Sequence, residues 1–98
     1  LVVKPYTDYI LSDTTRVRKF DERVAHGELV WHEDEFSRKI TVVASNNWQL
    51  QMDNNLPATL VEGETYSIPK GEYHRLIRGL GPLVIIIKED KEGNDYGI

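Results

Sequence analysis

Hydrophobic residues along this chain come in short runs rather than in helical stripes. Most runs are rich in β-branched and aromatic side chains, which favour extended backbone. Residues 48–52, Trp-Gln-Leu-Gln-Met, alternate between apolar and polar, as a strand with one buried face does. Turn-forming residues follow at Asp53-Asn54-Asn55. Further strands are predicted over 24–34, 40–44, 58–61, 65–68, 73–77 and 83–88.

Turn signals separate these runs at intervals of about eight to twelve residues. This spacing favours an antiparallel sandwich or barrel over alternating strands and helices. Residues 14–28 carry enough charge for a helix, but their apolar residues form only a narrow stripe. An extended strand is therefore favoured there over a short helix. We expect residues 1–21 to form an N-terminal arm or edge strand, and the polar residues 89–98 to form a flexible tail.

The composition limits the chain to one small domain. Its 98 residues are too few for two domains, and 40% of them are apolar, which is too many for a disordered chain. Without cysteine there are no disulfides, thiolate metal sites or cysteine nucleophiles. A net charge of −4 argues against nucleic acid, and no apolar run approaches the roughly 20 residues of a membrane span. No export signal is recognisable, so we expect a soluble, cytoplasmic protein.

The most informative segment is residues 63–78. It reads Gly-Glu-Thr-Tyr-Ser-Ile-Pro-Lys-Gly-Glu-Tyr-His-Arg-Leu-Ile-Arg. Gly63 permits a tight turn with positive φ, and Pro69 with Gly71 makes a sharp corner. His74 then comes early in the next strand, so we expect its side chain at the end of a sheet, beside that corner.

This spacing resembles the second signature of the cupin superfamily, G-x5-P-x-G-x2-H-x3-N. Gly63, Pro69, Gly71 and His74 match the signature, and Arg78 replaces its final asparagine. The resemblance covers residues 22–88. It implies a small single-domain cupin with an all-β fold, an antiparallel jelly-roll β-barrel. Because small cupins commonly pair through their sheets, it also implies a homodimer.

The first cupin signature, G-x5-H-x-H-x3,4-E-x6-G, is matched only in part. His32 stands at its first histidine and Asp34 at its second. Lys39 stands where the glutamate is expected, with Arg38 beside it, and Gly27 is one residue too close to His32. Cupins typically bind a metal through three histidines and this glutamate. Two of those four ligands are therefore replaced here.

The residues that remain are still a sufficient ligand set for a metal. His32 and Asp34 are two apart, so on a strand they point to the same side, and the cupin strand pairing would bring His74 to them. Two histidines and one carboxylate form the facial triad of non-haem Fe(II) oxygenases, and similar sites hold Mn, Ni or Zn. The alternative is a metal-free site, with His32 a hydrogen-bonded barrel residue and 33–35 a solvated acidic rim. Lys39 would repel a cation if it pointed inward, or it would pair with Asp34.

Three further side chains are candidates for ligand binding. Arg78 shares the face of His74 and could clamp a carboxylate or phosphate, or else pair with an acid of the barrel. Lys39 is a second anion donor, and Tyr66 flanks the predicted pocket mouth, although packing is the simpler interpretation of that ring. We expect a metal-dependent oxygenase or isomerase acting on a small polar or anionic molecule. The alternatives are a metal-free module that binds sugars or small acids, and metal-free acid–base catalysis by His32 or His74.

Overall fold

Antiparallel strands make up the regular structure of the molecule. A computed structural model describes residues 6–23 and 29–91, and this part of the chain contains strands and no helix. The strands are β1 (Tyr6–Ile10), β2 (Thr15–Phe20), β3 (Ser37–Ala44), β4 (Gln49–Met52), β5 (Ala58–Thr59), β6 (Thr65–Ile68), β7 (His74–Ile77) and β8 (Leu83–Asp90). The prediction of an all-β fold is confirmed, and Thr15–Phe20 is a strand, as favoured over a helix. No described segment forms a helix that is long and apolar enough to cross a membrane.

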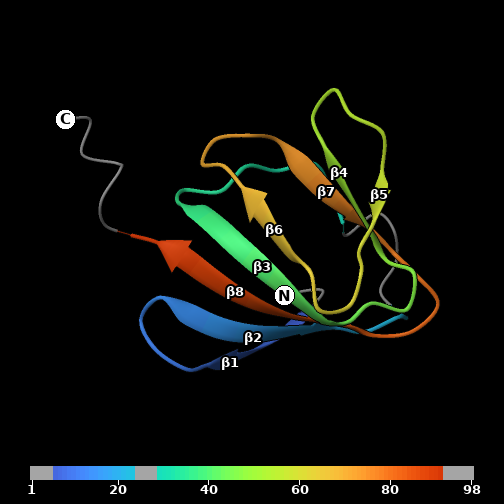
Figure 1. Ribbon diagram of the computed structural model, residues 1–98, viewed down its shortest axis with the longest axis horizontal. Coiled ribbons are helices and arrows are strands. Elements are labelled where there is room, and N and C mark those ends of the chain that lie inside the picture. The colour runs from blue at the N-terminus through green and yellow to red at the C-terminus, as the bar shows by residue number, and fades with distance from the viewer. Residues whose placement is uncertain (1–5, 24–28, 92–98) are drawn as a thin grey trace, which may run out of the picture.

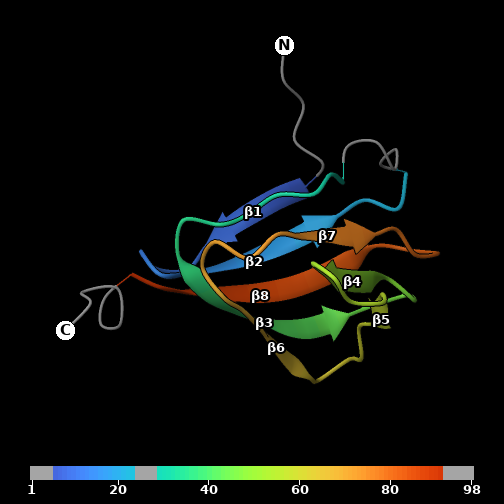
Figure 2. The same ribbon diagram turned by 90° about the horizontal axis from the view of Figure 1, so that it is seen from above.

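The strands form two sheets, which Figures 1 and 2 show from two directions. The five-stranded sheet has the order β1-β2-β8-β3-β6, and the three-stranded sheet has the order β5-β4-β7. All the pairings are antiparallel. Because β8 pairs with both β2 and β3, it is central to the large sheet.

The core lies between the inward faces of the two sheets. Residues alternate in burial along β8, where Leu83, Ile85, Ile87 and Glu89 are buried and the residues between them are not. Trp48 is fully buried, and its indole Nε1 donates a hydrogen bond to the Gly81 carbonyl at 2.6 Å. The buried apolar side chains are Phe20, Ile40, Val42, Trp48, Leu50, Leu60, Ile68, Leu83, Ile85 and Ile87.

Both predicted turns are present, and Gly63 has the predicted positive φ. Gly63 has φ 87° and Gly71 has φ 77°, values in the left-handed region that favours glycine. Gly79 serves a different purpose, because a Cβ there would overlap the Asn46 carbonyl oxygen and lie 2.6 Å from the Trp48 backbone nitrogen. The chain can pass this close to Trp48 only without a side chain at position 79.

The predicted barrel is not closed. Within the described residues, no strand pairing joins β6 to β5 or β1 to β7. The segment that contains His32 meets β7 in an isolated bridge between His32 and His74. The segment around His32 makes one bridge rather than a ladder, so it does not extend the small sheet to the large one. The arrangement is therefore two packed antiparallel sheets, open along their edges.

Several element boundaries differ from the sequence prediction. Residues 6–20, predicted as an arm or edge strand, form β1 at the edge of the large sheet together with β2, one position further in. Strand β8 continues through Asp90, two residues into the predicted tail, because Glu89 is buried and paired with arginines. Gly27 and the start of the strand predicted over 24–34 lie outside the described residues, as do residues 92–98.

Candidate metal centre

A cavity of about 350 Å³ lies between the sheets, and its lining combines charged, imidazole and apolar side chains. His32, His74 and Arg38 gather around Asp34, whereas Arg18 lies further along the large sheet, opposite Ile85 of β8. The rest of the wall is apolar or aromatic, contributed by Tyr6, Phe20, Leu29, Val30, Ile40, Leu50, Ile68, Leu76, Ile85 and Ile87. The cavity therefore combines a cluster of charged and imidazole groups around Asp34 with a largely apolar wall.

The backbone holds the two histidines directly opposite each other. His32 N–H donates to the His74 carbonyl at 3.0 Å, and His74 N–H donates to the His32 carbonyl at 2.9 Å. Residues paired in this way carry their side chains on the same face. The two rings meet edge to face, with centroids 4.4 Å apart.

Asp34 reaches the histidines because it is two residues beyond His32. Its backbone is tied to the Pro69–Gly71 corner, since Gly71 N–H donates to the Asp34 carbonyl at 3.2 Å. The corner predicted from the sequence thus fixes both ends of the group, because His74 follows it and Asp34 bonds to it. One nitrogen or oxygen from each of His32, Asp34 and His74 lies within 4.8 Å of the others.

Each histidine presents the same ring nitrogen to Asp34. His32 Nδ1 lies 2.9 Å from the Val30 carbonyl, and His74 Nδ1 lies 2.9 Å from the Glu72 carbonyl. A carbonyl oxygen only accepts hydrogen bonds, so each Nδ1 must carry the proton. In the neutral rings, Nε2 is then a bare lone pair. This is the arrangement that metal-binding histidines adopt, with the second nitrogen donating to a backbone carbonyl.

The distance between His74 and Asp34 fits two ligands of one cation, and the distance between His32 and Asp34 is slightly longer. His74 Nε2 lies 3.2 Å from Asp34 Oδ2, and His32 Nε2 lies 3.8 Å from Asp34 Oδ1. Bonds of about 2.0–2.2 Å to zinc place neighbouring ligand atoms about 3.0–3.5 Å apart. Asp34 Oδ2 is buried and, among the described residues, has no aligned hydrogen-bond partner while His74 Nε2 carries no proton. Two acceptors this close require either a proton or a metal ion between them.

In the metal-free protein, the proton takes that place. Burial disfavours the imidazolium of His74, but the Asp34 carboxylate outweighs burial, and the pKa of His74 is raised above its ordinary value of 6.5. Burial likewise disfavours the Asp34 carboxylate, but His74 and Arg38 outweigh it, and the pKa of Asp34 is lowered below 3.8. The 3.2 Å contact is then a charge-assisted hydrogen bond.

Arg38 is a member of the site that the sequence analysis did not assign. Its Nε lies 3.3 Å from Asp34 Oδ2, although the two are not aligned for a hydrogen bond, and its Nη2 donates to Glu89 Oε2 at 3.0 Å. Arg38 shares the inward face of β3 with Ile40 and Val42, and this two-residue period was the available signal. Lys39 is exposed and on the other face of β3, so neither alternative considered for it, repulsion of a cation or pairing with Asp34, is present.

Arg38 begins a chain of ion pairs that runs from the cavity across the large sheet. Arg16 joins Glu89 at 2.9 Å and Asp8 at 3.5 Å, and Asp8 accepts two hydrogen bonds from Arg18 at 2.7 and 2.9 Å. Burial disfavours the Asp8 carboxylate, but the two arginines outweigh it and lower its pKa. We call Asp34, Arg38, Glu89, Arg16, Asp8 and Arg18 the ion-pair chain. Sequence reasoning missed it, since it needs β1, β2, β3 and β8 in register.

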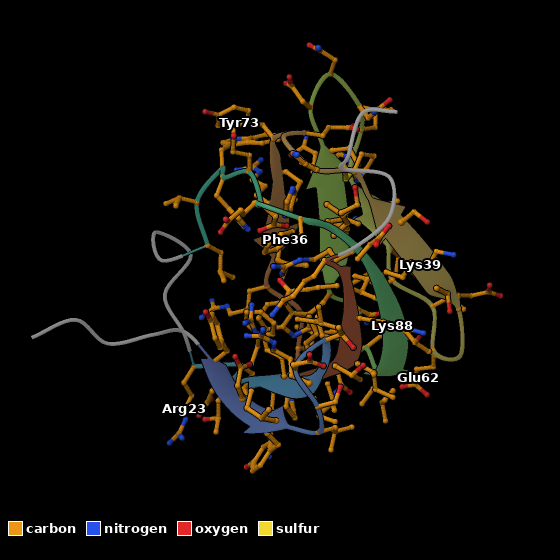
Figure 3. The ribbon with its side chains drawn as sticks, turned by 90° about the vertical axis from the view of Figure 1, so that its left-hand side faces the viewer. Arg23, Phe36, Lys39, Glu62, Tyr73 and Lys88 are labelled. Atoms are coloured by element: carbon orange, nitrogen blue, oxygen red, sulfur yellow. The ribbon has the colours of Figure 1, made fainter. Side chains whose placement is uncertain are left out.

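The other predicted ligand-binding residues lie outside this cavity. Arg78 comes after the last residue of β7 and is exposed, so the alternation that places His74 and Leu76 in the cavity does not reach it. The Tyr66 hydroxyl accepts a hydrogen bond from Val61 N–H at 2.9 Å, and its ring packs against the core. Lys39 lines a separate hollow of about 620 Å³ at the end of the large sheet. Figure 3 shows it on the same side of the sheet as Lys88, its direct neighbour on β8.

Comparisons with known proteins agree with the geometry at the level of the fold. The sequence matches no protein-family model and has no significant match among curated proteins. In structure it is similar to KdgF from Halomonas sp., with a TM-score of 0.66 and 20% identity over 96% of this chain and 88% of that one. A cupin-2 domain protein from Shewanella frigidimarina NCIMB 400 has a TM-score of 0.64 and 23% identity, over 87% of this chain and 79% of that one. The chain has the cupin fold.

Larger cupins are similar to it over part of their length. A structure of the DMSP lyases RdDddP and RnDddQII has a TM-score of 0.67 and 17% identity over 83% of this chain, which spans only 40% of the lyase. FeII HppE has a TM-score of 0.60 and 12% identity, over 78% of this chain and 41% of that one. At such identities the similarity identifies the fold and leaves the activity to be argued from the site.

Proposed function

We propose that His32, Asp34 and His74 bind one divalent transition-metal ion, and that the cavity then binds and acts on a small polar or anionic molecule. The observation that carries the proposal is the 3.2 Å contact between two buried acceptors, His74 Nε2 and Asp34 Oδ2. Both Nδ1 atoms are committed to carbonyl oxygens, so the Nε2 lone pairs are left for a cation. Two imidazoles and a carboxylate suit Fe, Mn, Ni or Zn.

The chain's own residues would orient the ligand atoms and keep water from one side of the site. The backbone pair between His32 and His74 sets the separation of the rings, and the carbonyls of Val30 and Glu72 fix their rotation. His74 is buried, whereas the His32 side chain is 49% exposed, so the open side of the site lies toward His32. A bound metal would supply Lewis-acid or redox chemistry, as an isomerase or an oxygenase requires.

A second candidate is a metal-free cavity that binds small acids or sugars. The observation in its favour is Arg38, whose guanidinium lies 3.3 Å from Asp34 Oδ2, where it adds positive charge that disfavours a metal ion. In this version the His74 imidazolium and Arg38 together hold the anion. The two candidates differ in whether a metal is present, which can be measured directly.

The test is the metal content of protein purified without chelators and without a nickel column. We expect about one equivalent of metal in the wild type, which His74→Ala removes. Since His74 is buried and its loss can affect folding, His32→Ala is the second variant, and its half-exposed side chain makes it the milder one. Glu35→Gln is the matched control, because this exposed carboxylate next to Asp34 is outside the triad.

Added metal gives a second measurement. At a free concentration one hundred times the dissociation constant, binding stabilises the fold by about 2.7 kcal/mol, or about 10–20 °C for a domain of this size. Absence of bound metal, together with no stabilisation by Fe, Mn, Ni or Zn, would contradict the proposal. Stabilisation of metal-free protein by small anions, lost in Arg38→Gln, would support the second candidate.

A further inference from the structure

The wall of the cavity restricts what the proposed site can accept. Apart from the Asp34 group and Arg18, the described lining residues are aliphatic or aromatic, and Tyr6 is the one among them with a hydroxyl. The wall includes Phe20, Leu29, Leu50, Leu76 and Ile85, which come from both sheets and the segment before His32. A molecule in this cavity therefore meets most of its hydrogen-bonding groups around Asp34 and hydrocarbon over most of the remaining wall.

Such a wall disfavours a polyhydroxylated ligand. Each sugar hydroxyl that leaves water needs a partner, and away from the Asp34 group the described wall residues offer only the Tyr6 hydroxyl and Arg18, which already donates two hydrogen bonds to Asp8. A hydrocarbon body gains free energy in the same place, because burial of apolar surface is favourable. The 350 Å³ cavity is at the small end of the usual range for ligand sites, which indicates a small molecule.

The charges beside the cavity indicate an anionic ligand. The ion-pair chain contains three arginines and three carboxylates, so it is neutral by itself while the histidines are neutral. The exposed Lys91 lies 3.8 Å from Glu89 and adds further positive charge. A divalent metal on the triad would raise the local charge by two. An anionic group on the ligand is the natural complement of that excess.

Arg38 is better placed than Arg18 to bind this anion. The Arg18 guanidinium is held by two hydrogen bonds to Asp8 and lies 3.6 Å from the centre of the Tyr6 ring. Arg38 donates one hydrogen bond, to Glu89, and its Nε has no hydrogen-bond partner within the described part of the chain. Its guanidinium thus retains donors beside the triad.

We propose that the cavity takes a small amphipathic monocarboxylate, whose carboxylate contacts Arg38 beside the triad and whose short hydrocarbon body lies on the apolar wall. This inference rests on the proposed function, because the metal supplies most of the excess positive charge. The inference restricts the proposed ligand class from small polar or anionic molecules to acids with an apolar body, and it argues against sugars.

The experiment compares four probes by calorimetric titration into zinc-loaded and metal-free protein: butyrate, hexanoate, butyramide and glucose. Each added methylene should strengthen binding about fourfold, so hexanoate should bind about fifteenfold more tightly than butyrate. Butyramide should bind at least tenfold more weakly than butyrate, because it lacks the charge. Glucose should not bind measurably.

Variants identify the arginine. Arg38→Gln should weaken hexanoate binding at least tenfold, and Arg38→Lys, which keeps the charge and the ion pairs, should recover part of that loss. Lys19→Gln is the control, because it removes an exposed cation next to Arg18 without altering the cavity lining. If Arg38→Gln does not fold, Arg38→Lys alone tests the claim through its weaker hexanoate binding.

The outcomes separate this inference from the proposed function. The inference would be overturned if zinc binds to the triad but hexanoate binds no more tightly than butyrate, or butyramide binds as tightly as butyrate. The proposed metal site would be unaffected by that result. Glucose binding more tightly than the acids would also overturn the inference. Absence of zinc, with the same ranking of acids in metal-free protein, would refute the metal site and support the acid site.

Discussion

Replacing Asp34 by asparagine should destabilise the metal-free protein in a pH-dependent way. Asp34 lies between His74 at 3.2 Å and Arg38 at 3.3 Å, and its side chain is 9% exposed. The raised pKa of His74 contributes stability below pH 6.5 that is lost as pH rises through that raised value. The lowered pKa of Asp34 contributes stability above pH 3.8 that is lost as pH falls through that lowered value. The pair is therefore most stabilising between these limits.

The size of the effect follows from what the substitution leaves behind. At pH 5, Asp34→Asn leaves the imidazolium of His74 and the guanidinium of Arg38 facing each other without a carboxylate. Removing one partner of a buried ion pair costs about 3–5 kcal/mol. At pH 9 the neutral His74 Nε2 can accept a hydrogen bond from the new amide, and this bond stabilises the variant by about 0.5–1.5 kcal/mol. The interaction that is still lost is the ion pair between Asp34 and Arg38. We expect a cost of about 1–2 kcal/mol there.

Urea denaturation of chelator-treated protein at pH 5 and pH 9 measures this difference. At each pH, the cost of the substitution is measured by how far it lowers the urea midpoint of unfolding. A cost that is about 2 kcal/mol larger at pH 5 than at pH 9 corresponds to a midpoint shift that is about 1 M larger at pH 5. Glu35→Gln controls for the loss of a nearby exposed carboxylate. An NMR titration of His74 should show its pKa falling in Asp34→Asn. Equal destabilisation at both pH values would refute the assignment of His74 and Asp34 as a coupled pair.

Three more predictions concern the fold and the metal. Gly79→Ala should lower the free energy of unfolding by about 3 kcal/mol or more, because the new Cβ would overlap backbone atoms. Gly81→Ala should lower it less, because the new Cβ would meet only the exposed Asn46 side chain, and thermal melts of the two variants measure the difference. Lys88→Glu should stabilise the fold by about 0.2–1 kcal/mol, because Lys88 lies directly across from Lys39, and the gain should shrink in high salt. Zinc affinity should rise about tenfold per pH unit below the raised pKa of His74, since zinc displaces that proton; a titration series that shows no pH dependence would contradict this.

The parts of the fold that depend on local chemistry could be predicted from the sequence. The turns at Gly63 and Gly71 follow from the need for positive φ, and both glycines have it. The run Leu83 to Lys88 is a strand because its β-branched apolar residues favour extended backbone. The two-residue spacing of His32 and Asp34 predicted that their side chains lie on one side of the chain. The corner before His74 predicted that His74 lies at the end of a sheet, and the three side chains are close together in the structure.

The rest depends on which strands pair, and no local pattern contains that information. Arg16 and Arg18 form ion pairs with Asp8 and Glu89 because β2 lies between β1 and β8. Arg78 was expected to continue the face of His74, but β7 ends at Ile77 and the alternation ends with it. The predicted closed barrel also depended on strand pairing. The segment at His32 forms a single bridge rather than a strand, so it does not join the two sheets.

The most direct test of the metal centre is X-ray absorption at the zinc edge of protein loaded with one equivalent of Zn²⁺. The site described here predicts a spectrum with two imidazoles and at least one oxygen ligand, at about 2.0–2.2 Å from the metal. One imidazole should disappear in His74→Ala. A spectrum without imidazole scattering, or one that His74→Ala leaves unchanged, would show that His32, Asp34 and His74 do not hold the ion.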